Sequence, residues 1–204
     1  MNIEITFTEP LLGTISGNKE ITEEFIASKN PNRIDEEEIE AVPLDETIEK
    51  SSTIFARHEG KPMLWDYQIK GFFKDACEAM INTGTLKKEE LKNVRLTQYL
   101  FRKTIDKLIF VTPRRIMLKL PQSLPELSFC ERPLRGQTMR GERIALARSE
   151  QAPEGTKIEL AITVLNDNLT NYVKRWLDYG ALLGIGQWRN SGMGRFKWQE
   201  LKSE

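Results

Sequence analysis

The sequence predicts an α+β fold of the ferredoxin-like type, and three observations lead to this expectation. Apolar and polar residues alternate in the short segments 2–7 and 157–165, as they do in half-buried strands. Apolar residues recur with helical spacing in the segments 65–80 and 169–183. Strands and helices are interleaved along the 204 residues of the chain. We therefore expect one α+β domain over residues 1–204.

The first elements can be predicted one by one. Asn2–Phe7 is expected to form the first strand, and the Glu-Pro pair that follows ends it. In the first helical segment, the apolar side chains stand at 69, 72, 73, 76, 77 and 80 and form one continuous face. Gly71 costs such a helix about 1 kcal/mol relative to alanine. We therefore expect another backbone, or a ligand, to pack closely against it.

More elements are expected downstream. Leu86–Ile105 is predicted to be helical, and it is followed by two strands, Leu108–Val111 and Arg115–Leu118. A last strand is expected at 195–198, after the helical segment 169–183. The predicted order is strand, helix, helix, strand, strand, arm, strand, helix, strand. This order is consistent with a ferredoxin-like, RNA-recognition-type sheet.

Charge divides the chain into two parts although the formal net charge is zero. Residues 1–60 hold 14 Asp and Glu against 5 Lys and Arg, whereas residues 61–204 hold 16 against 25. We interpret the stretch at about 17–59 as an acidic insertion and the larger part as a body that binds a polyanion. The alternative is ordinary solvated surface charge.

The stretch at about 121–150 is rich in proline and is predicted to form a basic arm, either irregular or a hairpin. Its arginines recur every three to five residues and could contact phosphates through their guanidinium groups. They are Arg132, Arg135, Arg140, Arg143 and Arg148. The alternative is a solvated loop, in which these arginines pair with Glu131, Glu142 and Glu150.

The most informative motif is a glycine-rich loop at 184–194, with the sequence Gly-Ile-Gly-Gln-Trp-Arg-Asn-Ser-Gly-Met-Gly. Glycine lets main-chain N–H groups approach an anion, and Arg189 and Arg195 add positive charge. Five residues separate the two Gly-x-Gly units and no Lys-Ser/Thr follows them, so the loop fits neither a dinucleotide fingerprint nor a P-loop. The motif indicates a phosphate backbone as the ligand. The alternative is a hairpin that only turns.

Several other classes of function are not indicated. Cys77 and Cys130 are far apart and have no histidine nearby, so we expect neither a disulfide nor a zinc site, and no other cofactor. No stretch approaches about 20 apolar residues, and the N-terminus has no basic region before an apolar run. We therefore expect a cytoplasmic protein with no membrane partner.

Three segments, in order, resemble the RAMP superfamily of CRISPR-associated RNA-binding proteins, in particular the backbone subunits of type III effectors. Gly60–Lys74 resembles the family's Pro-Gly-Ser-Ser-Leu-Lys-Gly-x-x-Arg helix start. Ala152–Leu160 is similar to the Pro-x-Gly-Thr entry into a family strand, and Gly180–Phe196 closely resembles the glycine-rich loop that is diagnostic of the superfamily.

The resemblance implies a modified RNA-recognition-motif fold, with the glycine-rich loop packed beside the first helix. It also implies sequence-independent binding of single-stranded guide RNA by a backbone subunit of an antiviral CRISPR ribonucleoprotein. The implied protein partners are other effector subunits and further copies of the chain, stacked head to tail. The residues expected to bind RNA are Lys70, Lys74, Arg132, Arg135, Arg140, Arg143, Gly184, Gly186, Trp188, Arg189, Asn190, Gly192, Gly194 and Arg195.

These residues have expected roles. The lysines, together with Arg189 and Arg195, would neutralise phosphates, and the amides of the loop would approach the RNA closely. The arm would separate bases, and Trp188 would either stack on a base or belong to the core.

Two alternatives stay open at this point. In the first, the chain is a metal-independent endoribonuclease that cuts guide precursor or target RNA, and His58 is the candidate base, assisted by Arg57 or Lys61. Ser51 and Ser52 stand where a target-cutting subunit is expected to carry an aspartate, so we favour binding without cutting. In the second, the chain docks on a CRISPR complex through its acidic insertion, as an inhibitor or a scaffold.

Overall fold

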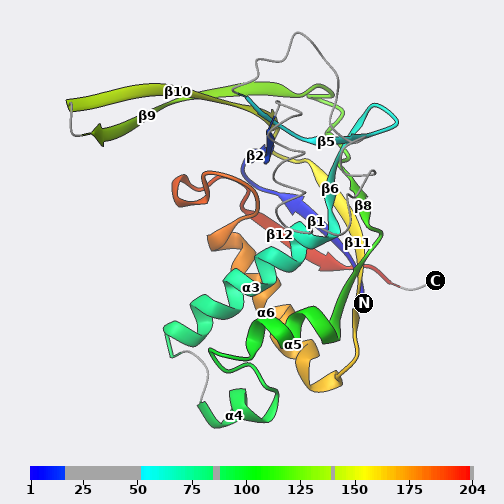
Figure 1. Ribbon diagram of the computed structural model, residues 1–204. Helices are drawn as coiled ribbons and strands as arrows, with labels where there is room; N and C mark the ends of the chain where they lie inside the picture. The colour runs from blue at the N-terminus through cyan, green and yellow to red at the C-terminus, as the bar shows by residue number, and fades with distance from the viewer. Residues whose placement is uncertain (17–51, 85–87, 139–140, 203–204) are drawn as a thin grey trace, which may run out of the picture.

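A computed structural model describes residues 1–16, 52–84, 88–138 and 141–202, and its centre is a four-stranded antiparallel sheet (Figure 1). The sheet has the order β12–β1–β11–β7. The strands are β1 (Asn2–Phe7), β7 (Ile109–Thr112), β11 (Lys157–Val164) and β12 (Phe196–Glu200). Two helices, α3 (Asp66–Asn82) and α6 (Thr170–Leu183), pack on one face of it. Strand–helix–strand–strand–helix–strand order in this arrangement is ferredoxin-like, which confirms the predicted α+β fold.

Alternation along the strands determines which face of the sheet is buried. In β11 the side chains of Ile158, Leu160 and Ile162 are buried under the helices, whereas Lys157 and Glu159 are exposed. Because side chains alternate between the two faces, a shift of one residue in register would expose the whole apolar set. The register of this strand is therefore determined by its sequence.

The core between the helices and the sheet is closed by aromatic side chains. The ring of Phe196 on β12 lies 5.2 Å from that of Phe72 and 6.1 Å from that of Phe7. Phe73 contacts the buried Trp176 of α6, with 5.9 Å between the ring centroids. Gly180 allows this packing, because a Cβ at that position would lie 2.1 Å from the Phe196 ring.

The single helix predicted over Leu86–Ile105 is wrong within the described residues. The chain forms α4 (Lys88–Asn93) and α5 (Phe101–Leu108), with irregular backbone between them. Arg95 has a φ of 57°, and two hydrogen bonds close the end of α4. Leu96 N donates to Leu91 O at 2.8 Å, and Arg95 N donates to Lys92 O at 3.1 Å. This is the Schellman pattern of helix ends, in which glycine usually occupies the left-handed position.

The predicted basic arm is a long two-stranded ribbon formed by β9 (Ser128–Thr138) and β10 (Gly141–Ala152), which we call the arm. It projects beyond the central sheet in Figure 1. Near its base, β10 pairs with β2 (Leu11–Leu12) and β4 (Thr53–Ile54), and β4 also pairs with β3 (Ile15–Ser16). The predicted range of about 121–150 overlaps this ribbon.

A third, small sheet has the order β5–β6–β8, from β5 (Ala56–His58), β6 (Lys61–Trp65) and β8 (Arg115–Met117). Two expectations need correction here. Residues 53–58, which we had assigned to the acidic insertion, form strands, and the strand at Arg115 lies outside the central sheet. The rest of the predicted insertion, 17–51, lies outside the described residues. No helix in the described ranges is both long and apolar enough to cross a membrane.

Candidate nucleic-acid interface

The glycine-rich loop joins α6 to β12 and folds back on itself. Gly184 and Gly194 have φ values of 73° and 70° and bring the two ends of the loop together. Ile185 N donates to Gly194 O at 2.9 Å, and a Cβ at Gly194 would lie 1.8 Å from the Ile185 carbonyl oxygen. Gly194 N in turn donates to Pro10 O at 2.9 Å. The glycines thus permit a close approach of backbone to backbone within the protein.

This geometry corrects the expected role of the loop amides. The N–H groups of Gly184, Gly192 and Gly194 all donate to backbone carbonyls of the protein. They are therefore not available to an RNA phosphate. Gly186 packs against the Leu12 carbonyl, from which a Cβ would be 3.0 Å away. Any contact of the loop with a polyanion must come from its side chains and from its other amides.

Side chains connect the loop to two other elements. The guanidinium of Arg189 forms an ion pair with Asp75 of α3, with 2.7 Å between Nη1 and Oδ2. Arg132 of the arm lies over the ring of Trp188, with its Cζ 4.8 Å from the centroid, and donates from Nη2 to Gln187 Oε1 at 3.3 Å. The loop therefore lies beside the first helix, and the base of the arm contacts it.

Arg132 and Arg195 have buried guanidinium nitrogens that lack a hydrogen-bond partner among the described residues. They are Nε and Nη1 of Arg132 and Nε of Arg195. Burial of a cationic N–H group without an acceptor is costly, and the face of Trp188 compensates this only in part for Arg132. An anion bound here would supply the missing acceptors.

A shallow hollow of about 550 Å³ lies next to these groups. It is lined by Tyr179, Leu182, Leu183, Trp188, Arg189, Asn190 and Arg195. Arg195 also packs across Gly192, where a Cβ would be 3.5 Å from its Cζ. Aromatic and cationic side chains in one open hollow suit a ligand that carries both phosphates and bases.

The remaining predicted arginines lie on the arm. The backbone of Arg135 and Arg143 belongs to β9 and β10, and their side chains, like Arg140 as a whole, lie outside what the structure describes. Asn190 is exposed within a short 3₁₀ turn, η2 (Arg189–Ser191). Their contacts with RNA stay predictions.

Lys70 and Lys74 lie on the flank of α3 that faces α5, whereas Asp75 lies on the flank that faces the glycine-rich loop. Lys74 forms an ion pair with Asp106 of α5 at 2.7 Å, and Lys70 donates to the backbone carbonyl of Asp106 at 3.2 Å. We had expected these lysines and Arg189 to neutralise phosphates together. The structure instead divides them between two flanks of the helix.

Gly71 lies between the two lysines on the solvent side of α3. A Cβ built at this position meets no atom within 4 Å. The expectation that another part of the protein backbone packs closely against it is therefore wrong for the described residues. The other expectation, a close approach by a ligand, stays a prediction.

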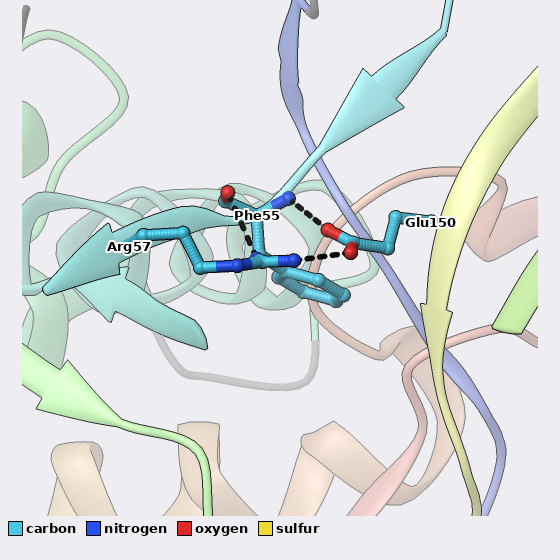
Figure 2. A network of polar contacts seen from close by, with 3 residues as sticks. All are labelled: Phe55, Arg57 and Glu150. Atoms are coloured by element: carbon cyan, nitrogen blue, oxygen red, sulfur yellow. Dashed lines mark hydrogen bonds and ion pairs between the residues drawn. The ribbon is translucent and has the colours of Figure 1, made fainter. Parts of the chain in front are cut away.

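His58, the candidate base, lies at the end of β5 and is half-buried. Its Nδ1 is 3.2 Å from Nη1 of Arg115, which comes from β8. Arg57 points elsewhere: it forms an ion pair with Glu150 and donates to the Phe55 carbonyl at 3.1 Å (Figure 2). Arg57 therefore does not assist His58.

Figure 2 shows a polar network that sequence reasoning missed. The Glu150 carboxylate at the base of the arm accepts from Phe55 N at 2.9 Å and pairs with Arg57. We had considered Glu150 as a partner of the arginines of the arm. It contacts instead a segment 93 to 95 residues away in the sequence, and no local pattern indicates such a pairing.

The outer face of the central sheet does not resemble the stacking surface of RNA-recognition motifs, which bind bases on sheet aromatics. Glu4 at its centre accepts from Lys157 and Gln199, each at 2.9 Å. Lys119 forms an ion pair with Glu159 beside it. In the described part of the chain, paired charges occupy the middle of this face, so we take the loop and α3 as the candidate interface.

In the ranges that the structure describes, no group of three or more His, Cys, Asp or Glu side chains is arranged to hold a metal ion.

Burial raises the pKa of the Cys77 thiol to about 12, and Glu78 adds to this effect, so Cys77 is an unreactive core residue.

Comparison with known proteins supports the fold. No family model and no curated protein matches the sequence. One similar solved structure is a chain of the Type III-B Cmr-beta complex bound to cognate target RNA, with 11% identity and a TM-score of 0.55. The match covers 98% of the present chain but only 58% of that chain.

A chain of a Type IV-B CRISPR complex is also similar, with 11% identity, a TM-score of 0.52, and coverage of 100% of the present chain and 92% of the other. Cmr6 from Pyrococcus furiosus matches with 12% identity and a TM-score of 0.47, over 97% of each chain. Identities this low show the fold alone. The chain therefore has a fold similar to that of these chains from a Type III-B and a Type IV-B CRISPR complex.

Proposed function

We propose that the chain binds single-stranded guide RNA along its backbone, as a subunit of a CRISPR effector ribonucleoprotein. The observation that carries this proposal is the pair of arginines at the glycine-rich loop, Arg132 and Arg195, each of which has a buried N–H group with no acceptor among the described residues. The RAMP-type fold supports the same conclusion, because one similar chain belongs to a complex bound to target RNA.

In this proposal the two arginines bind phosphates at the loop, and Arg189 is held beside them by Asp75 of α3. Guanidinium groups match phosphate geometry, and contacts to phosphate carry no sequence information. Binding is therefore independent of sequence, as a subunit that holds guide RNAs of many sequences requires. Arg132 connects the arm to the loop, and in this proposal the arm contacts bases or a neighbouring subunit.

The proposal is tested by fluorescence anisotropy of the full chain with a labelled single-stranded RNA of about 30 nucleotides over a salt series. We expect affinity to fall with salt, with a slope of about −0.7 per phosphate contact on a single strand. Arg132→Ala and Arg195→Ala should each weaken binding and reduce the slope by about that amount. Arg102→Ala is the matched control, because this exposed arginine on α5 pairs with Glu78.

Two results would contradict the proposal. One is no binding at low salt. The other is weakening by Arg132→Ala and Arg195→Ala no greater than that caused by Arg102→Ala. A gel of the same samples detects cutting. Shortened RNA that disappears in His58→Ala would instead support the endoribonuclease alternative.

A further inference from the structure

A second hollow adjoins the one beside the glycine-rich loop, and we call them the α6 hollow and the loop hollow. The α6 hollow has a volume of about 280 Å³ and is formed by α6 together with the last turn of α3. It is lined by Met80, Arg175, Asp178, Tyr179 and Leu182. Because Tyr179 and Leu182 also line the loop hollow, the two hollows share a wall. The surface around Arg195 thus continues along α6.

The shared wall is apolar and accessible. Arg175, Tyr179 and Leu182 follow one another at intervals of four and three residues, so they form one row along α6. Leu182 is 64% exposed, whereas Tyr179 and Met80 are half-buried and pack against the core. A ring that the core already holds loses little conformational entropy when a ligand stacks on it. The row therefore offers a prepared apolar contact.

The hydrogen-bonding groups at the two ends of this row differ. At the loop end, Arg132 and Arg195 carry buried N–H groups that have no acceptor among the described residues. At the other end, Arg175 and Asp178 bring a donor and an acceptor to the α6 hollow. Asp178 Oδ1 accepts from Trp198 Nε1 at 2.8 Å, which holds the carboxylate in place. Since a carboxylate has about four acceptor positions, Asp178 can accept a further hydrogen bond.

The size of the apolar contact indicates its occupant. Over Thr170–Leu183, all of which the structure describes, Leu182 is the one large apolar side chain that is exposed. The other exposed positions of this helix are polar or small, namely Asn171, Arg175, Asp178 and Ala181. A stable protein interface buries about 800 Å² on each partner and has an apolar centre. An apolar contact made by one exposed leucine and one ring suits a single planar group better.

A nucleotide combines such a planar group with an anion. In the proposed function, Arg132 and Arg195 bind RNA phosphates, and one sugar connects each phosphate to a base. A base at this point either stays in water or enters an adjoining hollow, and stacking on an aromatic ring makes the hollow more favourable. The edge of every base also carries donors and acceptors, which Arg175 and Asp178 complement. The α6 hollow therefore matches a base whose phosphate is bound at the loop.

We infer that the α6 hollow is a base pocket, in which a base of the bound strand stacks on Tyr179 and packs against Leu182 and Met80. The inference rests on the proposed function and deepens it, because it names the part of the RNA that the site holds besides the phosphates. Any of the four bases can enter, since each has an aromatic face and an edge with donors and acceptors. The pocket thus adds affinity without reading the sequence.

The test compares two labelled strands of equal length in the anisotropy assay with the full chain. One is an ordinary single-stranded RNA, and the other is an abasic strand, which has the same ribose and phosphate groups but no bases. Tyr179→Ala should lower the ratio of the two affinities about 5- to 100-fold, since a stacked base contributes that range of affinity. Leu182→Gln should lower the ratio in the same direction. Affinity for the abasic strand and the slope against salt should not change, because neither residue is charged.

Three controls accompany these variants. Leu165→Gln is the matched control, because Leu165 is 63% exposed but lines neither hollow. Tyr179→Phe keeps the ring and should keep the ratio. Leu182→Gln changes an exposed position of a helix in which glutamine and leucine have similar propensities, so it tests the pocket even if Tyr179→Ala unfolds. Circular dichroism reports whether each variant is folded.

The outcomes separate the inference from the proposed function. If Arg132→Ala and Arg195→Ala weaken the binding of both strands while Leu182→Gln leaves the ratio as Leu165→Gln does, the inference is overturned and the proposed function stands. If neither strand binds at low salt, both are overturned. Equal weakening of both strands by the Tyr179 and Leu182 variants would indicate a structural role and overturn the base pocket. An unchanged ratio with altered sedimentation of these variants would identify a face for self-association, which also overturns it.

Discussion

Replacement of Glu150 by alanine is expected to destabilise the protein by about 3 kcal/mol, at the lower end of the range of about 3–5 kcal/mol for breaking a buried ion pair. The Glu150 side chain is only 6% exposed, and its carboxylate serves both Arg57 and the backbone N–H of Phe55 (Figure 2). Its loss leaves that N–H without an acceptor, which alone costs about 1–3 kcal/mol. Arg57 is 19% exposed, so water recovers part of its solvation, which places the estimate at the lower end.

Urea denaturation followed by tryptophan fluorescence measures this change, and the thermal midpoint should fall by about 6–12 °C for a chain of this size. Glu131→Ala is the control, because Glu131 forms an exposed ion pair with Arg148 at 3.6 Å and should cost less than about 1 kcal/mol. Equal effects of the two substitutions would refute the reasoning. The double variant Arg57→Ala/Glu150→Ala should lose less stability than the two single variants lose in total, because the two groups interact directly.

Two more predictions concern α3. Gly71→Ala should raise the free energy of unfolding by about 1 kcal/mol, because alanine favours a helix and its Cβ meets no atom within 4 Å, and a decrease in urea denaturation would contradict this. Burial raises the pKa of Cys77 from 9.0 to about 12, which favours the neutral thiol in the folded state. The folded state therefore keeps the thiol proton up to a higher pH than the unfolded state does. The contribution of Cys77 to the free energy of unfolding is complete below pH 9 and falls between about pH 9 and 12, by about 1.4 kcal/mol per pH unit. In Cys77→Ala, part of the alkaline loss of stability should disappear, as pH-dependent denaturation would show.

The periodic elements of the fold could be predicted from the sequence because their signals are local. The predicted helix over 65–80 is observed as Asp66–Asn82, and the strand predicted at 157–165 as Lys157–Val164. Apolar spacing determined the buried face of each element. Composition also drew attention to two segments, because glycine stands out at 184–194 and proline and arginine stand out at about 121–150.

The end of α4 and the partners of the charged side chains depended on the tertiary structure. The Schellman turn after α4 has Arg95 where glycine is usual, so the sequence carried no stop signal there. The pairs Arg189–Asp75 and Arg57–Glu150 join residues 114 and 93 positions apart, and their choice of partner depends on how the elements pack.

The candidate interface shows the same division between local and distant information. Composition identified the basic and aromatic residues, but not their distribution over two flanks of α3. Whether Lys70 lies beside Phe110 or beside Arg189 depends on which elements pack against the helix. Whether Tyr67 stacks on Trp65 depends on the burial of Trp65. The sequence alone thus determined which basic and aromatic residues are candidates for binding a polyanion, and only the tertiary structure decided which of them lie together, because proximity in space is a property of the packed chain.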